Sequence, residues 1–306
     1  MSLLTNAQVE GFKREGYLVA KGIIPERFVS GLRDDISRVI DKQADALLAE
    51  GKITELHRHL DFLHRATQLH AQSPDILSPL SHYAGEGIFR LITCPEILDA
   101  MGQLLGPEIV ASSVYRIRPK LPFRPEGIIP WHQDSAYFDP FADGHLIVTC
   151  WVPLMNATVE AGCMEVLPRS HTQGVLRHYW AVTSAPGLSV HPDYLPETRP
   201  VPVPADVGDA VLLTNLTCHR STENNSSLIR WAADLRYNGP AAGDYYPFEA
   251  QFLARSPSDP RKVLTEVADF ARLRAEHVLP APAVRRAWLK QAEETFIKPP
   301  PVWELP

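Results

Sequence analysis

The first quarter of the chain places apolar residues at the spacing of amphipathic helices. Thr5 and Gln8 form a capping box, and Gly16 is placed to end the helix that they begin. The apolar run YLVA follows as a short strand. A second helix is predicted from Pro25, and a third over PEILDAMGQLLG, residues 95–106. The apolar positions that indicate the second helix are Phe28, Leu32, Ile36, Val39 and Ile40.

The pattern changes at about residue 109, where short strand-like runs replace the helical period. Turns rich in Pro, Gly, Asn and Asp separate these runs. The runs are IVASSVYRI, LIVTCWVPL, CMEVLP, DAVLLTNLTCH and LIRWAADLRY. Helices followed by antiparallel strands are typical of a jelly roll with helices packed on one side, and not of a parallel sheet built from βαβ units.

A helical pattern returns near residue 265, and the chain ends in the run KPPPVWELP, which is expected to be extended. The sequence shows neither an internal repeat nor a linker-like segment. We therefore predict an α+β fold in a single domain over residues 1–306. It comprises a mainly helical part over 1–108, a metal-binding β core over 109–237 and a C-terminal helical and extended segment over 238–306.

Composition and charge narrow the class of protein. The 306 residues suffice for a large core, and 45% apolar with 22% charged residues argues against disorder along the whole chain. The net charge of −6 disfavours a nucleic-acid partner, which usually requires a basic face. The N-terminus lacks a signal-peptide pattern, and no stretch approaches the roughly 20 apolar residues of a membrane span. We expect neither a nucleic-acid nor a membrane partner.

The four cysteines are widely separated and include no C-x-x-C pair. This spacing is typical of neither a disulfide framework nor a zinc knuckle, so a reduced, cytoplasmic protein is expected. The oligomeric state is not indicated by the sequence. The cysteines are Cys94, Cys150, Cys163 and Cys218.

The stretch WHQD brings two candidate metal ligands together. On a strand, positions i and i+2 share a face, so His132 and Asp134 would point toward one ion. On a helix they would diverge by about 200°. The same His-x-Asp pattern recurs at 59–61, in a helical-looking segment, and at 191–193, in a loop with proline. Neither recurrence is predicted to form a site.

A third ligand is available at His219, which closes a β-rich run. The turn-like STENNSS separates it from Arg230, which predicts a hairpin between the two residues. Two imidazoles and one carboxylate suit Fe(II) and leave positions open for other ligands. Arg230 is able to bind a carboxylate at the far end of a molecule that chelates the iron. Asp234 and Arg236 share its strand face, and Asp234 is a possible ion-pair partner of either arginine.

The segments around these residues resemble the phytanoyl-CoA dioxygenase family. The resemblance lies in the order and spacing of His-x-Asp, a distal histidine and an arginine, and it covers roughly residues 4–237. The matching stretches are LTNAQVEGFKREGYLVAKGIIP, WHQDSAYF, HLIVTCWVPLMNATVEAGCMEVLPRSH and GDAVLLTNLTCHRSTENNSSLIR.

The resemblance implies a double-stranded β-helix that binds Fe(II) and 2-oxoglutarate and consumes O2. His132, Asp134 and His219 match the iron ligands of the family. Arg230 matches the residue that holds the distal carboxylate of 2-oxoglutarate, and Ser221 matches a serine that assists it. Further positions that match the cosubstrate pocket are Gln133, Trp151 and Tyr115. A family lysine that contacts 2-oxoglutarate has no clear counterpart in the sequence.

The expected activity is hydroxylation of an aliphatic C–H bond of a small molecule, with release of succinate and CO2. Desaturation and ring closure remain open, as does the substrate. One alternative is a metal-dependent cupin-type enzyme that does not use 2-oxoglutarate, and another is a catalytically silent binding protein on the same fold. The basic stretch RIRPKLPFRP, residues 116–125, either attracts an anionic substrate or is a solvated strand end.

Overall fold

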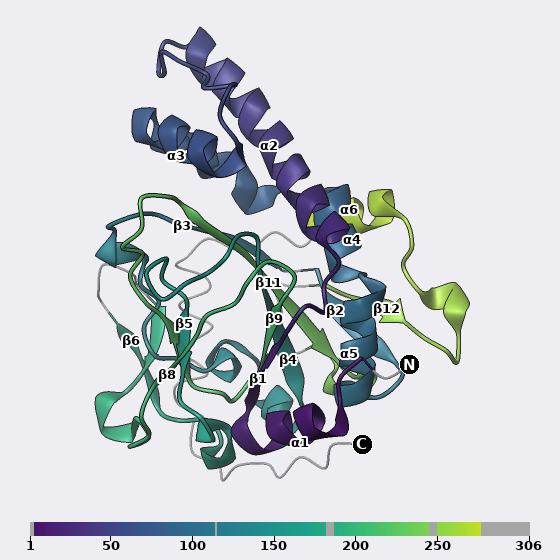
Figure 1. Ribbon diagram of the computed structural model, residues 1–306. Coiled ribbons are helices and arrows are strands. Elements are labelled where there is room, and N and C mark those ends of the chain that lie inside the picture. The colour runs from purple at the N-terminus through teal and green to yellow at the C-terminus, as the bar shows by residue number, and fades with distance from the viewer. Residues whose placement is uncertain (1–2, 114, 182–186, 245–249, 277–306) are drawn as a thin grey trace.

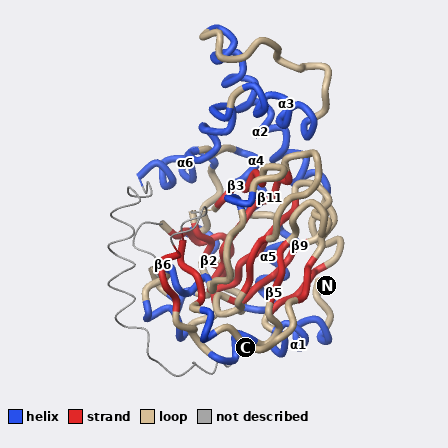
Figure 2. Tube along the Cα trace, turned by 90° about the vertical axis from the view of Figure 1, so that its left-hand side faces the viewer, coloured by secondary structure: helices blue, strands red, loops and turns tan. Residues whose placement is uncertain are grey.

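The computed structural model describes residues 3–113, 115–181, 187–244 and 250–276. Helices α2 and α3 rise together above the β-strands, whereas α1 lies at the opposite end (Figure 1). Figure 2 shows the same division in a view turned by 90°. The α-helices are α1 (Asn6–Glu15), α2 (Glu26–Ala49), α3 (Phe62–Gln72), α4 (Glu86–Ile92), α5 (Pro95–Leu105) and α6 (Val267–Glu276).

The strands of the described residues form antiparallel sheets. The large sheet has the order β1-β9-β4-β11-β2-β12, with β3 also paired to β11, and a smaller sheet has the order β10-β5-β8. Strands β6 and β7 pair with each other. The strands are β1 (Tyr17–Ala20), β2 (Ile109–Ser112), β3 (Arg116–Lys120), β4 (Ile147–Pro153), β5 (Met164–Val166), β6 (His178–Ala181), β7 (Gly187–Val190), β8 (Val201–Val203), β9 (Ala210–Thr214), β10 (His219–Ser221), β11 (Arg230–Asn238) and β12 (Gln251–Arg255).

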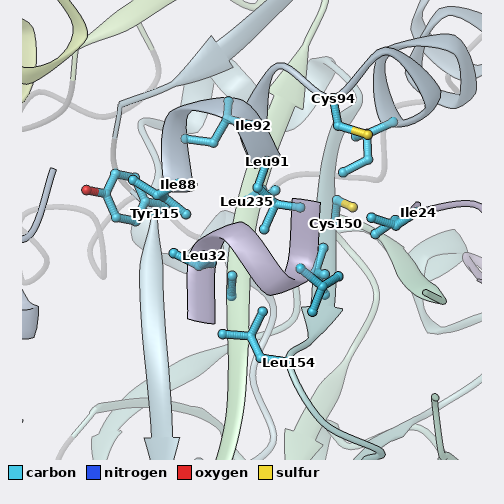
Figure 3. Packing of buried hydrophobic residues seen from close by; sticks show 14 of the residues in the cluster. Ile24, Leu32, Ile88, Leu91, Ile92, Cys94, Tyr115, Cys150, Leu154 and Leu235 are labelled. Atoms are coloured by element: carbon cyan, nitrogen blue, oxygen red, sulfur yellow. The ribbon is translucent and has the colours of Figure 1, made fainter. Parts of the chain in front are cut away.

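The large sheet buries both of its faces. On one face, Leu32 of α2 and Ile88 of α4 belong to the same buried cluster as Cys150 and Leu235 of the sheet (Figure 3). Side chains of the opposite face form a second cluster with the small sheet. Its members include Trp151, Val211, Ala232, Met164 and Val166. This arrangement explains why β4 is buried along its whole length, since alternate residues enter different cores.

The predicted helix boundaries in the N-terminal part are confirmed. Thr5 and Gln8 form the capping box of α1, and Gly16 ends the helix with a φ of 81°. Pro25 is the N-cap residue of α2. The third predicted helix corresponds to α5, which begins at Pro95. Capping therefore determines both ends of α1, whereas α2 and α5 begin at or directly after a proline without a side-chain cap.

The predicted hairpin between His219 and Arg230 is wrong. His219 opens β10, which pairs with β5 in the small sheet, whereas Arg230 opens β11 in the large sheet. The run before His219 is also interrupted, because β9 ends at Thr214 and the Thr217 N–H donates to the Thr214 carbonyl in a turn, at 3.0 Å. This turn lets the chain cross from one sheet to the other.

The helical reading of residues 57–61 is wrong as well. The α3 helix begins only at Phe62, because the Asp61 carboxylate accepts hydrogen bonds from the Leu63 and His64 N–H groups as an N-cap. His57 has a positive φ of 48°, which no helix contains. The C-terminal run KPPPVWELP lies outside the described residues. Within the described ranges, none of the helices has the length and apolar character needed to cross a membrane.

Candidate metal centre

His132, Asp134 and His219 converge in the interior of the β region. Their potential ligand atoms lie within 4.8 Å of one another, and all three residues are buried. The backbone brings the two histidines together: the His132 N–H donates to the His219 carbonyl at 3.0 Å, and the His219 N–H donates back at 2.9 Å. This isolated antiparallel bridge holds the imidazole centroids 4.2 Å apart.

Both imidazoles are oriented by backbone carbonyls. The Nδ1 of His132 lies 2.9 Å from the Pro130 carbonyl, and the Nδ1 of His219 lies 2.9 Å from the Thr217 carbonyl. Because a carbonyl only accepts, each Nδ1 carries a proton, and Nε2 is the ring nitrogen that is available to a metal ion. Burial, with a contribution from His219, lowers the pKa of His132 to about 3, so this ring is neutral. Neutral imidazoles are the form that binds a metal ion.

Asp134 completes the set as a carboxylate. The Thr149 hydroxyl donates to its Oδ2, and the Arg236 Nη2 donates to its Oδ1 at 3.3 Å. Burial alone would raise the pKa of Asp134. The Arg236 guanidinium, the two imidazoles and the Thr149 hydroxyl outweigh burial and hold that pKa well below its usual range. Asp134 therefore stays ionised before any metal arrives.

The strand predicted for WHQD is only partly present. His132 forms a single bridge, and Asp134 already begins a 3-10 turn, Asp134–Tyr137. The intervening Gln133 is nonetheless extended, with φ −115° and ψ 141°. This extended residue is sufficient to place the side chains of His132 and Asp134 on one side of the chain.

Gln133 itself is buried in another direction. Its Nε2 donates to the carbonyls of Gly174 and Leu216, and its Oε1 accepts from the Leu176 N–H. Among the described residues, Gln133 does not line the cavity at the metal ligands. The Gln133 side chain instead links the two loops that contain Gly174 and Leu216.

A cavity of about 380 Å³ opens at the three candidate metal ligands. This volume is within the range of small-molecule sites. Three of the residues predicted to bind the cosubstrate, Ser221, Trp151 and Arg230, line the same space. The structure therefore brings the metal-binding set and the predicted carboxylate-binding residues into one site.

Arg230 is a buried cation with unused hydrogen-bond donors. It is only 3% exposed, and its Nη2 makes one long contact of 3.4 Å to the Gly162 carbonyl. Its Nε and Nη1 have no partner within the described part of the chain. Burial lowers the pKa of Arg230 to about 10, which still leaves it charged at neutral pH. Leaving such donors unpaired costs free energy, so the geometry favours an anionic ligand.

The neighbouring acidic residue on β11, Asp234, forms its ion pair with Arg118 and not with Arg230. Asp234 accepts a hydrogen bond from the Arg118 Nε at 2.7 Å, and Arg236 bonds to Asp134. Trp151 lies beneath the Arg230 guanidinium, with 5.2 Å between the Arg230 Cζ and a ring centroid. This aromatic contact restricts the arginine without supplying a negative charge.

Lys120 is a site residue that the sequence reasoning missed. It is the register partner of Arg230 across β3 and β11 and is only 5% exposed. Its Nζ donates to the Gly127 carbonyl and to the Ser221 Oγ, both at 2.9 Å. Burial, with contributions from Arg230 and Arg118, lowers the pKa of Lys120 to about 7. The basic run over 116–125 was the available signal, but only the strand register shows which of its cations faces the site.

Tyr115 is not brought to the cavity. Its hydroxyl donates to the Tyr83 carbonyl, and its ring stacks on Phe270 with centroids 6.0 Å apart. Figure 3 shows Tyr115 beside Ile88, in the cluster between the helices and the large sheet. It therefore belongs to the core on the helical side of that sheet.

A buried pair of imidazoles with one carboxylate, next to a buried arginine that forms no ion pair with the described residues, is typical of non-haem iron oxygenases that use 2-oxoglutarate. The family model for phytanoyl-CoA dioxygenase (PhyH) matches residues 12–232, and the chain belongs to this family.

Two curated relatives show how far the similarity extends. The peroxisomal phytanoyl-CoA dioxygenase of Homo sapiens is 25% identical over 241 residues, which cover 77% of this chain and 69% of the relative. The methylphosphonate hydroxylase of Gimesia maris is 25% identical over 247 residues, which cover 79% and 83% of the two chains.

Solved structures share the fold. The apo form of the non-heme monooxygenase ThoJ has a TM-score of 0.58 at 19% identity, covering 94% of this chain and 99% of that one. The epimerase SnoN in complex with Fe3+, alpha ketoglutarate and nogalamycin RO has a TM-score of 0.51 at 19% identity, covering 76% and 82%. The chain is an oxygenase that depends on Fe(II) and 2-oxoglutarate and consumes O2, and its family acts on small molecules.

Proposed function

We propose that this enzyme hydroxylates an aliphatic C–H bond of a small molecule while 2-oxoglutarate is converted to succinate and CO2. One observation carries the proposal: three candidate metal ligands line the same cavity as the buried Arg230, whose Nε and Nη1 have no partner among the described residues. A metal alone would not require this arginine, so the arrangement favours an oxygenase over a cupin-type enzyme without 2-oxoglutarate.

The donor set fits a ferrous ion. The Nε2 atoms of His132 and His219 and the carboxylate of Asp134 would hold Fe(II) and leave one side of it open. Bound there, Fe(II) supplies the reactivity toward O2 that no side chain offers. The protein's own contribution is geometric, because backbone carbonyls orient the rings and Thr149 orients the carboxylate before the metal binds.

The distal carboxylate of 2-oxoglutarate would lie between Arg230 and Lys120. These two cations face each other on adjacent strands, and a carboxylate between them relieves their mutual repulsion. The Ser221 Oγ accepts from the Lys120 Nζ and from the Ile129 N–H, each at 2.9 Å, and so positions the lysine. We assign Trp151 to the wall that keeps water from the arginine. Gln133 would support the site from behind without contacting the cosubstrate.

The predicted double-stranded β-helix is consistent with the antiparallel sheets. We infer that the large sheet, which carries Arg230, and the small sheet, which carries His219, form the two halves of this jelly roll. We further propose that residues 1–306 fold as a single domain. The cytoplasmic location expected from the scattered cysteines stays a prediction.

The test is spectroscopic. Anaerobic addition of Fe(II) and 2-oxoglutarate should produce a weak visible metal-to-ligand charge-transfer band, and admitting O2 should release succinate. The His219→Ala variant serves as the control and should give neither signal. A protein that binds the metal but gives no band would support the cupin-type alternative. A band without succinate, with any candidate substrate, would support a silent binding protein.

A further inference from the structure

The cavity is lined by an excess of positive charge, although the chain as a whole has a net charge of −6. Only two carboxylates, Asp134 and Asp234, line it among the described residues. The basic residues that line it are Arg118, Lys120, Arg124, Arg220, Arg230 and Arg236. A cleft with one dominant sign of charge focuses the field and attracts ligands of the opposite sign.

Ion pairs with residues outside the cavity lining neutralise only part of this excess of positive charge. Arg220 is balanced from outside the lining by Glu165, with 2.6 Å between its Nη2 and the carboxylate. Arg124 is left out of the count because it has an interaction of its own. Arg118, Lys120, Arg230 and Arg236 then stand against Asp134 and Asp234, an excess of two positive charges when Lys120 is protonated. The two positive charges of Fe(II) and the two negative charges of 2-oxoglutarate cancel each other when both are bound. The loaded site is therefore still positive by the same amount.

The basic residues of the cavity lining differ in exposure, and this difference separates a role in cosubstrate binding from a role in substrate binding. Lys120 and Arg230 are 5% and 3% exposed, in keeping with a cosubstrate that binds first and deep in the cavity. The Arg118 side chain is 38% exposed. It lies two residues from Lys120 on the same face of β3, about 7 Å along the strand. Arg118 is thus a partly exposed cation that lies directly beside the proposed cosubstrate site on β3, where an incoming substrate would reach it.

The Arg118 side chain is oriented by a hydrogen bond that leaves its terminal nitrogens available. Its Nε donates to Asp234 at 2.7 Å, and no other nitrogen of Arg118 makes a hydrogen bond to the described residues. The terminal nitrogens are the ones that bind a carboxylate or a phosphate in a forked geometry. Apolar residues of the same lining, Leu121, Ile129 and Met164, offer contact to an uncharged remainder of the ligand.

We propose that the substrate carries a carboxylate or phosphate group and that Arg118 binds this group. The inference rests on the proposed function, because it concerns the substrate of the same site. It assigns the basic stretch over 116–125 two tasks: Lys120 binds the cosubstrate, and Arg118 selects the substrate.

The test uses matched probes on the full-length protein loaded anaerobically with Fe(II) and saturating 2-oxoglutarate. Phenylacetate and phenylacetamide have nearly the same shape and differ in charge, and benzylphosphonate separates a phosphate preference from a carboxylate preference. Each probe is titrated while the shift of the charge-transfer band is followed. We expect at least one anionic probe to bind about tenfold tighter than the amide, and increasing salt should reduce the difference.

Variants then test whether Arg118 is responsible for the preference for anionic probes. Arg118→Gln, which still offers a donor to Asp234, should abolish the preference for the anion, and Arg118→Lys should restore part of it. Arg261→Gln is the matched control, because it removes one positive charge from a side chain that is 91% exposed and is not part of the cavity lining. It should keep the preference unchanged.

Several results would overturn the inference. These are equal binding of phenylacetate and phenylacetamide, no binding of either anion at millimolar concentration, and an unchanged preference in Arg118→Gln. A failure of the proposed function itself looks different, because the band would then be missing before any probe is added.

Discussion

The buried charge of Arg230 indicates that an anionic ligand binds at this position. A guanidinium that is 3% exposed, with two nitrogens unpaired in the described structure, lacks both solvation and a counter-ion. Desolvating a charge without a partner is costly, and an anionic ligand offsets that cost when it binds. In the proposed complex the bound carboxylate would regain this free energy, and the site would thereby favour a dicarboxylate.

Replacing this arginine should weaken cosubstrate binding with little effect on the metal. We expect Arg230→Ala to reduce the affinity for 2-oxoglutarate by roughly 2–5 kcal/mol, the scale for removing one partner of a desolvated charge pair. An anaerobic titration of the charge-transfer band measures this loss. Arg261→Ala is the control, since its side chain is 91% exposed. Unchanged affinity in Arg230→Ala would remove this residue from the cosubstrate site.

Lys120 should make cosubstrate binding depend on pH. Burial lowers its pKa to about 7 in the free protein, and a bound carboxylate favours the protonated form. Binding is then strongest below pH 7. Above pH 7 the free lysine loses its proton and must regain it to bind, so affinity falls by up to about tenfold per pH unit. Affinities measured between pH 6 and 9 test the trend, and a Lys120→Met variant with the same slope would contradict this origin.

Strand β11 is the element that organises the site. Arg230, Asp234 and Arg236 are separated by four and by two positions, so they occupy one face of the strand, and all three line the cavity. Antiparallel pairing with β3 places Lys120 opposite Arg230, and pairing with β4 places Trp151 opposite Asp234. Two strand registers therefore fix the relative positions of the charges and of the aromatic wall.

Gly162, in the connection between β4 and β5, tests how tightly this arrangement is packed. Its φ is 73°, and an added Cβ would lie 2.8 Å from the carbonyl oxygens of Thr222 and Glu223. Gly51 has nearly the same φ, 71°, but nothing lies within 4 Å of its added Cβ. Comparing alanine substitutions at these two glycines separates the free-energy cost of the positive φ from the cost of the steric clash.

We expect Gly162→Ala to destabilise the protein by about 1–3 kcal/mol more than Gly51→Ala does, because only the first variant is overpacked. Urea denaturation of both variants measures the difference. Gly162→Ala should also weaken 2-oxoglutarate binding, since the Gly162 carbonyl contacts the Arg230 Nη2. Equal destabilisation by the two substitutions would show that the neighbouring carbonyls move aside.

On the scale of the whole molecule, the three candidate metal ligands connect distant parts of the fold. His219 belongs to the small sheet, and Asp134 is bonded to Thr149 and Arg236 of the large sheet. The unfolded chain holds no such preformed site. Binding of a metal ion therefore couples to folding of the β region.

A metal ion should stabilise the folded protein. At a free concentration one hundred times the dissociation constant, the free energy of unfolding should rise by about 2.7 kcal/mol, and a chelator should reverse the increase. Ni(II), which is not oxidised in air, is a convenient probe in urea or thermal denaturation. The His219→Ala variant should lose the stabilisation. The same increase in that variant would place the metal elsewhere.

Much of the site could be predicted from local sequence because its chemistry is carried by short segments. His132 and Asp134 are two residues apart, so a single extended residue between them was enough to place them together. The turn chemistry around Thr5 and Gly16 likewise determined a helix boundary without help from the rest of the fold. The roles of these ligands toward iron stay predictions until the spectroscopic test is made.

The remaining features depend on which face of a strand meets which partner, and only the tertiary structure decided them. Lys120 is one of several cations in a basic run, and pairing of β3 with β11 selected it as the neighbour of Arg230. Tyr115 is close in sequence to Lys120 but belongs to the core on the helical side. The physical reason is that local propensity determines helix ends, whereas register and sheet partner are set by how the whole core packs.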